Sequence, residues 1–105
     1  AGKRTPRLMK YVFHPEALNE YSEAVKYYAG QNTEIAQAFI NSVENAIYRL
    51  RDSPNRYPAI DKDIRRCLTQ KFPYGILYTV ESDSILILAV MHCKQKPGYW
   101  KTRQK

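Results

Sequence analysis

The sequence predicts a single α+β domain in which a helical hairpin packs on one face of a twisted antiparallel sheet. Three observations predict it. The chain has 105 residues, a length that supports one hydrophobic core rather than two. Its first half carries two stretches with apolar residues at three- and four-residue spacing, the period of amphipathic helices. Its second half carries short β-branched and aromatic runs separated by turn residues, a pattern typical of a meander of strands.

The first predicted strand is Lys10–Phe13, where β-branched and aromatic residues follow one another until His14 and Pro15 stop the pattern. Pro15 suits the first turn of a helix, which is predicted to run to about Ala29 and to end at Gly30. The apolar residues at helical spacing are predicted to face the core; they are Ala17, Leu18, Tyr21, Ala24, Val25 and Tyr28. The opposite face is predicted to be solvated and carries Glu16, Glu20 and Glu23.

The second predicted helix begins at an N-cap, Asn32 or Thr33, and ends before Asp52-Ser53-Pro54. Its apolar stripe consists of Ile35, Ala36, Phe39, Ile40, Val43, Ala46, Ile47 and Leu50. Because the connection between the helices is short, they are predicted to form an antiparallel hairpin. The prediction for Tyr21, Tyr27 and Tyr28 is a place in the core rather than in a ligand site.

Three further strands complete the order β-α-α-β-β-β. Prolines at 54 and 58 predict a loop at Asn55–Ala59. The strands that follow are predicted at Ile64–Leu68, Gly75–Val80 and Ser84–His92, with a corner at Phe72-Pro73-Tyr74. The last strand is almost entirely apolar, so we expect it to be central and covered on both faces.

The open face of the sheet is predicted to be polar and cationic. Because side chains alternate along a strand, Ile64 and Leu68 are predicted to face the helices and Arg65 the open side. Arg66 would then extend past the helices, a conflict that a β-bulge would remove.

The net charge of +7 is concentrated in the second half of the chain. Residues 9–61 carry five cations against seven acids, whereas residues 62–105 carry nine cations against three acids. Residues 1–8 add three cations. We expect this opening segment to be an addition for expression or a disordered arm, with Met9 as the native start and residues 9–105 as the domain. The positive field of the second half favours an anionic partner.

Several classes of protein are not predicted. No apolar run approaches the roughly 20 residues of a membrane span, and the first residues lack the apolar centre of an export signal. Cys67 and Cys93 lack the spacing of a zinc site, and we expect them to be free thiols in a reducing cytoplasm. Nothing in the sequence predicts a cofactor or a bound metal.

The C-terminal run gathers the residues that could bind an anion. Between His92, where the strand ends, and Arg103 the chain carries four cations and an adjacent aromatic pair, and no acidic residue occurs after Asp83. The residues concerned are His92, Lys94, Lys96, Tyr99, Trp100, Lys101 and Arg103. Trp100 has a structural interpretation as well, as an apolar anchor that holds the tail on the sheet.

The order of short motifs along the chain resembles the RelE/ParE superfamily of bacterial toxins, including its plasmid-stabilisation branch. The motifs are His14-Pro15-Glu16-Ala17, Tyr27-Tyr28, Ala38-Phe39, Pro54 and Pro58, Arg65-Arg66, Phe72-Pro73-Tyr74, Val90-Met91-His92, and Pro97-Gly98-Tyr99-Trp100 with Arg103. They extend over essentially the whole domain, from Met9 to Arg103. The resemblance implies a type II toxin-antitoxin protein that an acidic antitoxin holds inactive, with the pair repressing its own operon.

The resemblance leaves three hypotheses for the activity. The first is ribosome-dependent cleavage of mRNA, which would make the protein a metal-independent endoribonuclease. The second is ParE-like inhibition of DNA gyrase without catalysis. The third is a weak or inactive toxin that acts through antitoxin binding and autoregulation of the operon.

Cleavage of RNA by its 2′-hydroxyl requires a proton acceptor, a proton donor and cations that hold charge on the phosphate. An imidazole can exchange a proton near neutral pH, so His92 is the candidate acid or base. Arg65, Lys94 and Lys96 are the candidates to hold the phosphate. Tyr99, the last member of the predicted catalytic set, or Trp100 is the candidate to stack on a base. The residues predicted to bind RNA or another anion around this set are Arg66, Trp100, Lys101 and Arg103. Similar proteins often carry Arg where Lys94 and Lys96 stand, which weakens the case for planar phosphate recognition there.

Overall fold

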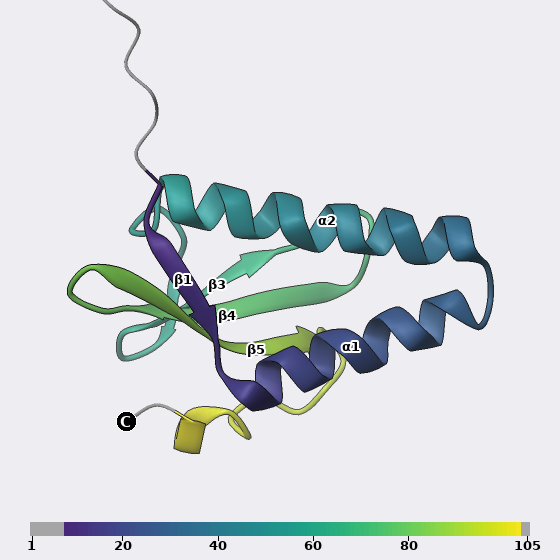
Figure 1. The fold of residues 1–105 in the computed structure, drawn as a ribbon. Coiled ribbons are helices and arrows are strands. Elements are labelled where there is room, and N and C mark those ends of the chain that lie inside the picture. Colours follow the sequence, from purple (N-terminus) through teal and green to yellow (C-terminus); the bar gives the residue numbers. More distant parts are fainter. Residues whose placement is uncertain (1–7, 104–105) are drawn as a thin grey trace, which may run out of the picture.

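The computed structural model describes residues 8–103, so the expectation for residues 1–8 lies outside it except at Leu8. Figure 1 shows two helices side by side on one face of the sheet, which confirms the predicted α+β class and the helical hairpin. The five strands lie in the order β1-β5-β4-β3-β2. The elements are β1 (Lys10–Phe13), α1 (Pro15–Ala29), α2 (Thr33–Asp52), β2 (Ala59–Asp61), β3 (Ile64–Leu68), β4 (Tyr74–Val80), β5 (Ser84–His92) and a short 3-10 helix, η1 (Lys101–Arg103).

Both helices begin at caps that the sequence supplies. The imidazole Nδ1 of His14 accepts a hydrogen bond from the Glu16 N–H at 3.0 Å, directly before Pro15 starts α1. Asn32 caps α2, and its Oδ1 accepts from two N–H groups of the first turn at 2.7 and 3.2 Å. Gly30 ends α1 as predicted, although its φ of −65° is right-handed, so the helix does not use the left-handed glycine cap. No helix among the described residues is long and apolar enough to cross a membrane.

The sheet is mixed, which corrects the prediction of a wholly antiparallel sheet. β3, β4 and β5 form the predicted antiparallel meander, but β1 pairs in parallel with β5, with Tyr11 opposite Ile85. The strands β1 and β5 are far apart in sequence and separated by the helical hairpin, and such a crossover allows parallel pairing. The alternation within a strand carries no information about its direction, so the sequence could not predict this pairing.

A further strand, β2, extends into the segment that was predicted to be a loop. Ala59 pairs with Arg65 on β3, and a register shift follows before Asp61. β2 has three residues and lies at the edge of the sheet, a position that tolerates a proline just before the strand. The two prolines therefore restrict β2 to a short edge strand and do not abolish it.

The main core lies between the helices and the sheet. Phe39 of α2 is fully buried at its centre, and its ring lies 4.9–5.3 Å from the rings of Tyr28, Phe72 and Tyr74. The apolar stripe of α2 is buried as predicted except at Ile35, which is exposed, and Ile40, which is half-buried. On α1, Leu18 and Tyr27 were predicted to be in the core but are 53% and 63% exposed. A periodic pattern gives the width of an apolar face only approximately, so residues at its margin can remain in water.

A second apolar cluster lies on the opposite face of the sheet. It contains Ile64, Leu77, Leu88, Ala89, Met91 and Trp100. Trp100 is only 2% exposed, which confirms its prediction as the anchor of the C-terminal tail. This face is therefore partly apolar and covered by the tail, and β5 is covered on both faces as predicted.

The second cluster reverses the predicted faces of β3. Cys67 faces the helices, where its thiol lies 3.7 Å from the Ala46 carbonyl oxygen, and Ile64 packs in the cluster on the other side. Arg65 consequently lies on the helix side, and Arg66, opposite Leu77, lies on the far side. The register of β3 with β4 contains no bulge. The prediction failed because it assumed that only the helices could cover apolar side chains.

The two cysteines are free thiols, as expected. Burial raises the pKa of the Cys67 thiol, although the nearby Arg49 acts in the opposite direction. Since the thiolate is the reactive form, Cys67 is expected to be chemically inert in the folded protein. Cys93 is exposed in the turn after β5.

Candidate functional site

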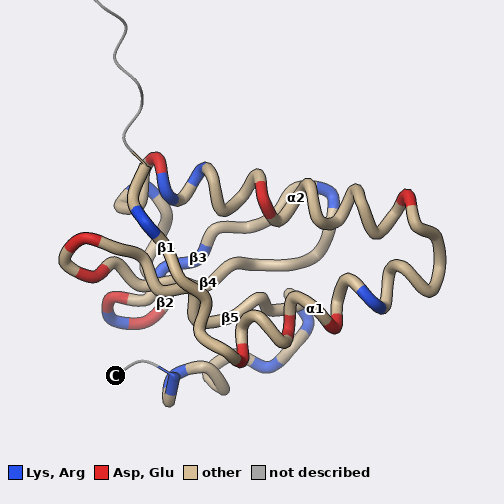
Figure 2. Tube along the Cα trace, viewed as in Figure 1, with Lys and Arg blue, Asp and Glu red and all other residues tan. Residues whose placement is uncertain are grey.

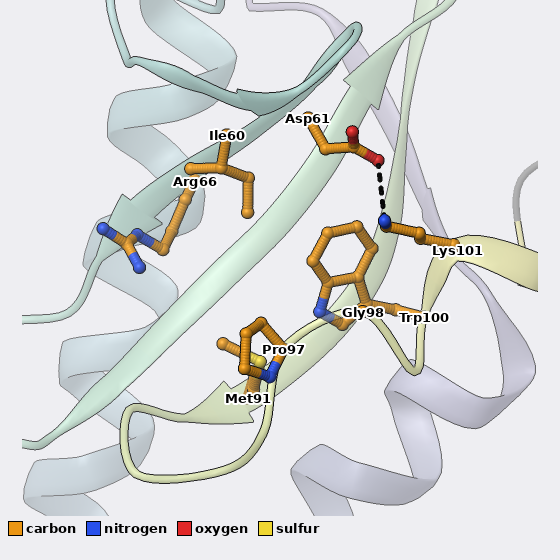
Figure 3. A pocket seen from close by; sticks show the side chains of 8 residues that line it. All are labelled: Ile60, Asp61, Arg66, Met91, Pro97, Gly98, Trp100 and Lys101. Atoms are coloured by element: carbon orange, nitrogen blue, oxygen red, sulfur yellow. Dashed lines mark ion pairs between the residues drawn. The ribbon is translucent and has the colours of Figure 1, made fainter.

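The strongest candidate site is a pocket on the face of the sheet opposite the helices. Figure 3 shows it between Arg66 and Ile60 on one side and Trp100 on the other, with Pro97 and Met91 below them. The pocket has a volume of about 390 Å³. The side chains that line it come from β2, β3, β5 and the tail: Ile60, Asp61, Arg66, Met91, Pro97, Gly98, Trp100 and Lys101.

The tail reaches this face because the chain reverses after β5. The φ of Gly98 is +102°, a left-handed conformation that a side chain would strain, and the turn leads directly into the buried Trp100. The indole ring packs on Ile64 and Leu88, yet its Nε1–H has no acceptor among the described residues. A buried donor without a partner is rare in folded proteins and suggests that the site is completed by a ligand or water.

The charges of the pocket are predominantly positive. Lys101 forms an ion pair with Asp61 at 3.8 Å, whereas Arg66 forms no ion pair with any residue of the described range. The aliphatic stem of Arg66 lies over Gly75, where a Cβ would be only 3.1 Å from the Arg66 Cδ. Gly75 therefore allows the stem to lie flat on β4, and Arg66 remains partly exposed at the pocket.

Arg103 and Tyr99 serve mainly to hold the tail in place. The Arg103 guanidinium forms an ion pair with Glu20 at 3.0 Å and donates to the Leu88 carbonyl at 2.9 Å. It also lies 5.0 Å from the centre of the Tyr99 ring. Burial raises the pKa of the Tyr99 hydroxyl, and the neighbouring Glu20 carboxylate adds to the effect. Two residues predicted to act on RNA are thus engaged within the protein.

Glu20 was predicted to lie on a solvated helix face, but in the structure its carboxylate binds partners within the protein. Its carboxylate accepts from Arg103 and, with its other oxygen, from the Val90 N–H at 3.0 Å. β1 ends at Phe13, so the end of β5 has no neighbouring strand on that side, and Glu20 and Arg103 satisfy the exposed backbone groups instead. The helix pattern alone could not identify Glu20, because its partners lie about 70 and 83 residues further along the chain.

Replacing Glu20 with alanine is expected to lower the free energy of unfolding by about 1.5–3 kcal/mol, because two hydrogen bonds to a charged group are lost. Urea denaturation of the purified protein measures the change. The matched control is Glu23→Ala, which removes a 63% exposed side chain from the same helix and should change stability by less than about 0.5 kcal/mol. Equal losses in the two variants would contradict the structural role of Glu20.

His92 lies at the end of β5 on the helix side of the sheet. Its ring meets that of Tyr74 edge-on at 5.1 Å, and its Nδ1 accepts from the Lys94 N–H at 3.0 Å. It borders two shallow pockets of about 290 and 440 Å³ beside α1, and three tyrosines share in lining them: Tyr27, Tyr28 and Tyr74. Burial raises the pKa of the hydroxyls of Tyr28 and Tyr74, so both remain neutral hydrogen-bonding groups at physiological pH.

The predicted catalytic set does not converge on one point. Arg65 is opposite Tyr78 on β4 and donates through Nη1 to the carbonyls of Asn55 and Tyr57 at 3.2 and 2.5 Å. His92 is opposite Tyr74, four residues away along β4, which corresponds to about 13 Å. The structure therefore separates the proposed acid or base from the proposed phosphate ligand.

The lysines of the turn after β5 are exposed. Lys94 and Lys96 form no ion pair with any residue between 8 and 103. Figure 2 shows cations on β3, on this turn and on η1, whereas acidic residues lie along α1.

The sequence did not identify the tyrosines beside His92 or Asp61 of the pocket as site residues. They come together with the other site residues only in the folded sheet.

Comparison with known proteins finds one matching family model and a similar solved structure. A family model described as the ParE toxin of the type II toxin-antitoxin system parDE matches residues 11–97. A solved structure described as the chromosomal ParDE TA system from P. aeruginosa superposes with a TM-score of 0.72, over 83% of this chain and 98% of that chain. The two sequences are 15% identical, so this likeness is one of fold. A search of curated proteins finds no match.

Proposed function

Because the chain belongs to the ParE toxin family of type II toxin-antitoxin systems, we propose that it arrests growth by inhibiting DNA gyrase without catalysing a reaction. The family membership confirms the resemblance noted in the sequence and implies an antitoxin partner. Under this proposal the protein acts in the cytoplasm, where gyrase works on DNA. Under this proposal the toxin inhibits gyrase by binding to its surface, and gyrase is not a substrate of the toxin.

The observation that carries the proposal is that Arg65 and His92 both form hydrogen bonds within the protein and lie apart. Arg65 holds the loop between α2 and β2 through the carbonyls of Asn55 and Tyr57. His92 uses Nδ1 to close the turn after β5, and it lies far from Arg65 along the sheet. General acid-base catalysis needs groups within hydrogen-bond reach of one reacting phosphate. This arrangement favours a binding surface over a nuclease centre.

Ribosome-dependent cleavage of mRNA is the second candidate, and one observation favours it. His92 lies beside an aromatic pocket of about 440 Å³ that Tyr27, Tyr28 and Tyr74 also line, and aromatic rings can stack on the bases of single-stranded RNA. The exposed Lys94 follows directly in the turn. Under this candidate His92 would have to act through its other ring nitrogen, Nε2.

Induction of the protein in bacteria separates the two candidates. We expect an SOS response and arrest of DNA replication while mRNA remains uncut, as gyrase inhibition requires. The informative variant is His92→Asn, whose Oδ1 can replace Nδ1 as the acceptor for the Lys94 N–H but cannot exchange a proton near neutral pH.

Growth arrest by His92→Asn should equal that by the unaltered protein. Primer extension on cellular mRNA and an SOS reporter provide the two readouts. Cuts within codons that precede the SOS response and disappear in His92→Asn would overturn the proposal in favour of the nuclease.

A further inference from the structure

The pocket that Arg66 and Trp100 line has one accessible hydrogen-bond donor, the Arg66 guanidinium, and one buried donor, the indole N–H. Arg66 is partly exposed and forms no ion pair within residues 8–103, and the buried Trp100 Nε1–H has no acceptor among them. Figure 3 shows the indole nitrogen on the edge of the ring that faces Pro97 and Met91. Pro97 belongs to an exposed turn at the edge of the pocket.

The charge around the pocket specifies an anion. Lys101 is 58% exposed and its pair with Asp61 spans 3.8 Å, so this ion pair is weak and Lys101 can contact another anion. Lys62 follows Asp61 in the chain and Lys96 precedes Pro97, so two more exposed cations adjoin the lining residues. The indole N–H and the guanidinium are both donors that suit an oxyanion.

The arrangement suits a phosphate in a nucleic acid backbone better than a single carboxylate. A guanidinium matches the oxygens of one phosphate in a fork, and cations distributed around it match the charges of the phosphates on either side. Gyrase, the proposed target, works on DNA, so a toxin bound to it has DNA within reach. We propose that this pocket binds a backbone phosphate of DNA, and that the toxin thereby recognises gyrase in its DNA-bound form. This inference rests on the proposed function.

The direct test uses the purified full chain and a short fluorescein-labelled DNA duplex in the absence of gyrase. Fluorescence anisotropy should show binding at low salt that weakens as salt rises, because phosphate contacts release counterions. Trp100 is the single tryptophan of the chain, so a DNA-dependent change in its emission would report directly on the pocket.

The decisive variant is Arg66→Gln, which should weaken binding at low salt about tenfold and reduce the slope of log K against log salt by about 1. The matched control is Lys26→Gln, which removes one cation from the exposed surface of α1 and should change affinity less than twofold. If Arg66→Gln misfolds, as judged by circular dichroism, Lys101→Gln serves in its place, and a loss of affinity relative to Lys26→Gln is expected again.

Three results would overturn the inference: no binding of DNA at low salt, equal effects of Arg66→Gln and Lys26→Gln, or competition by poly-glutamate of matched charge as strong as that by DNA. The last result would assign the pocket to an acidic peptide instead. Gyrase inhibition that persists without any DNA binding by the toxin would refute this inference alone. DNA binding without gyrase inhibition would refute the proposed function.

Discussion

Replacing Trp100 with alanine is expected to lower the free energy of unfolding by about 3–5 kcal/mol, the range for removing a large aromatic side chain from a core. Trp100 is 2% exposed and fills the centre of the apolar cluster on the open face of the sheet, against Ile64, Leu88 and Met91. It is also the anchor that brings the tail, with Lys101 and Arg103, onto that face. Its loss should therefore remove both the cluster and the walls of the pocket.

The matched control is Trp100→Phe, which keeps a six-membered aromatic ring and removes the five-membered ring with the N–H that has no acceptor in the described structure. A change that preserves most of the apolar volume should cost less than about 1.5 kcal/mol. Urea denaturation followed by circular dichroism measures both variants, since the fluorescence of Trp100 is lost in each. A cost below about 1 kcal/mol for Trp100→Ala would mean that the tail is not part of the folded core.

The elements of the fold were predictable because their signals are local. Pro15, the cap at Asn32 and the helical spacing of apolar residues predict α1 and α2, and the structure agrees with the predicted bounds except that α2 includes Asp52. The bounds of β1, β3 and β5 also agree with the prediction. Each of these signals lies within a few residues of the element that it specifies.

The arrangement of the elements was harder to predict. The parallel pairing of β1 with β5 joins residues about 74 positions apart, such as Tyr11 and Ile85, and no pattern within either strand specifies it. Arg65 lies on the helix side of the sheet because Ile64 packs in a second apolar cluster on the opposite side, and this cluster includes Trp100 of the tail. Tertiary packing determined both features.

The sequence predicted which residue types form the candidate site but not which of these residues lie together. The sequence identified the cations and aromatic residues of the second half of the chain, and Arg66, Trp100 and Lys101 do line one pocket. It grouped Arg65 with His92, which the strand register separates. Glu20 was missed because it resembles its solvated neighbours on α1 until the tail supplies Arg103 as its partner.

The most direct test of the account is a titration of purified DNA gyrase with the toxin in a supercoiling assay, with a purified translation system beside it. A non-catalytic inhibitor should abolish supercoiling once the toxin approaches the molar amount of gyrase. At a lower ratio the residual activity should not decline with further incubation, and mRNA in the translation system should remain intact. His92→Asn should behave in the same way. Full supercoiling at a large excess of folded toxin, together with cleavage of mRNA on translating ribosomes, would contradict the account.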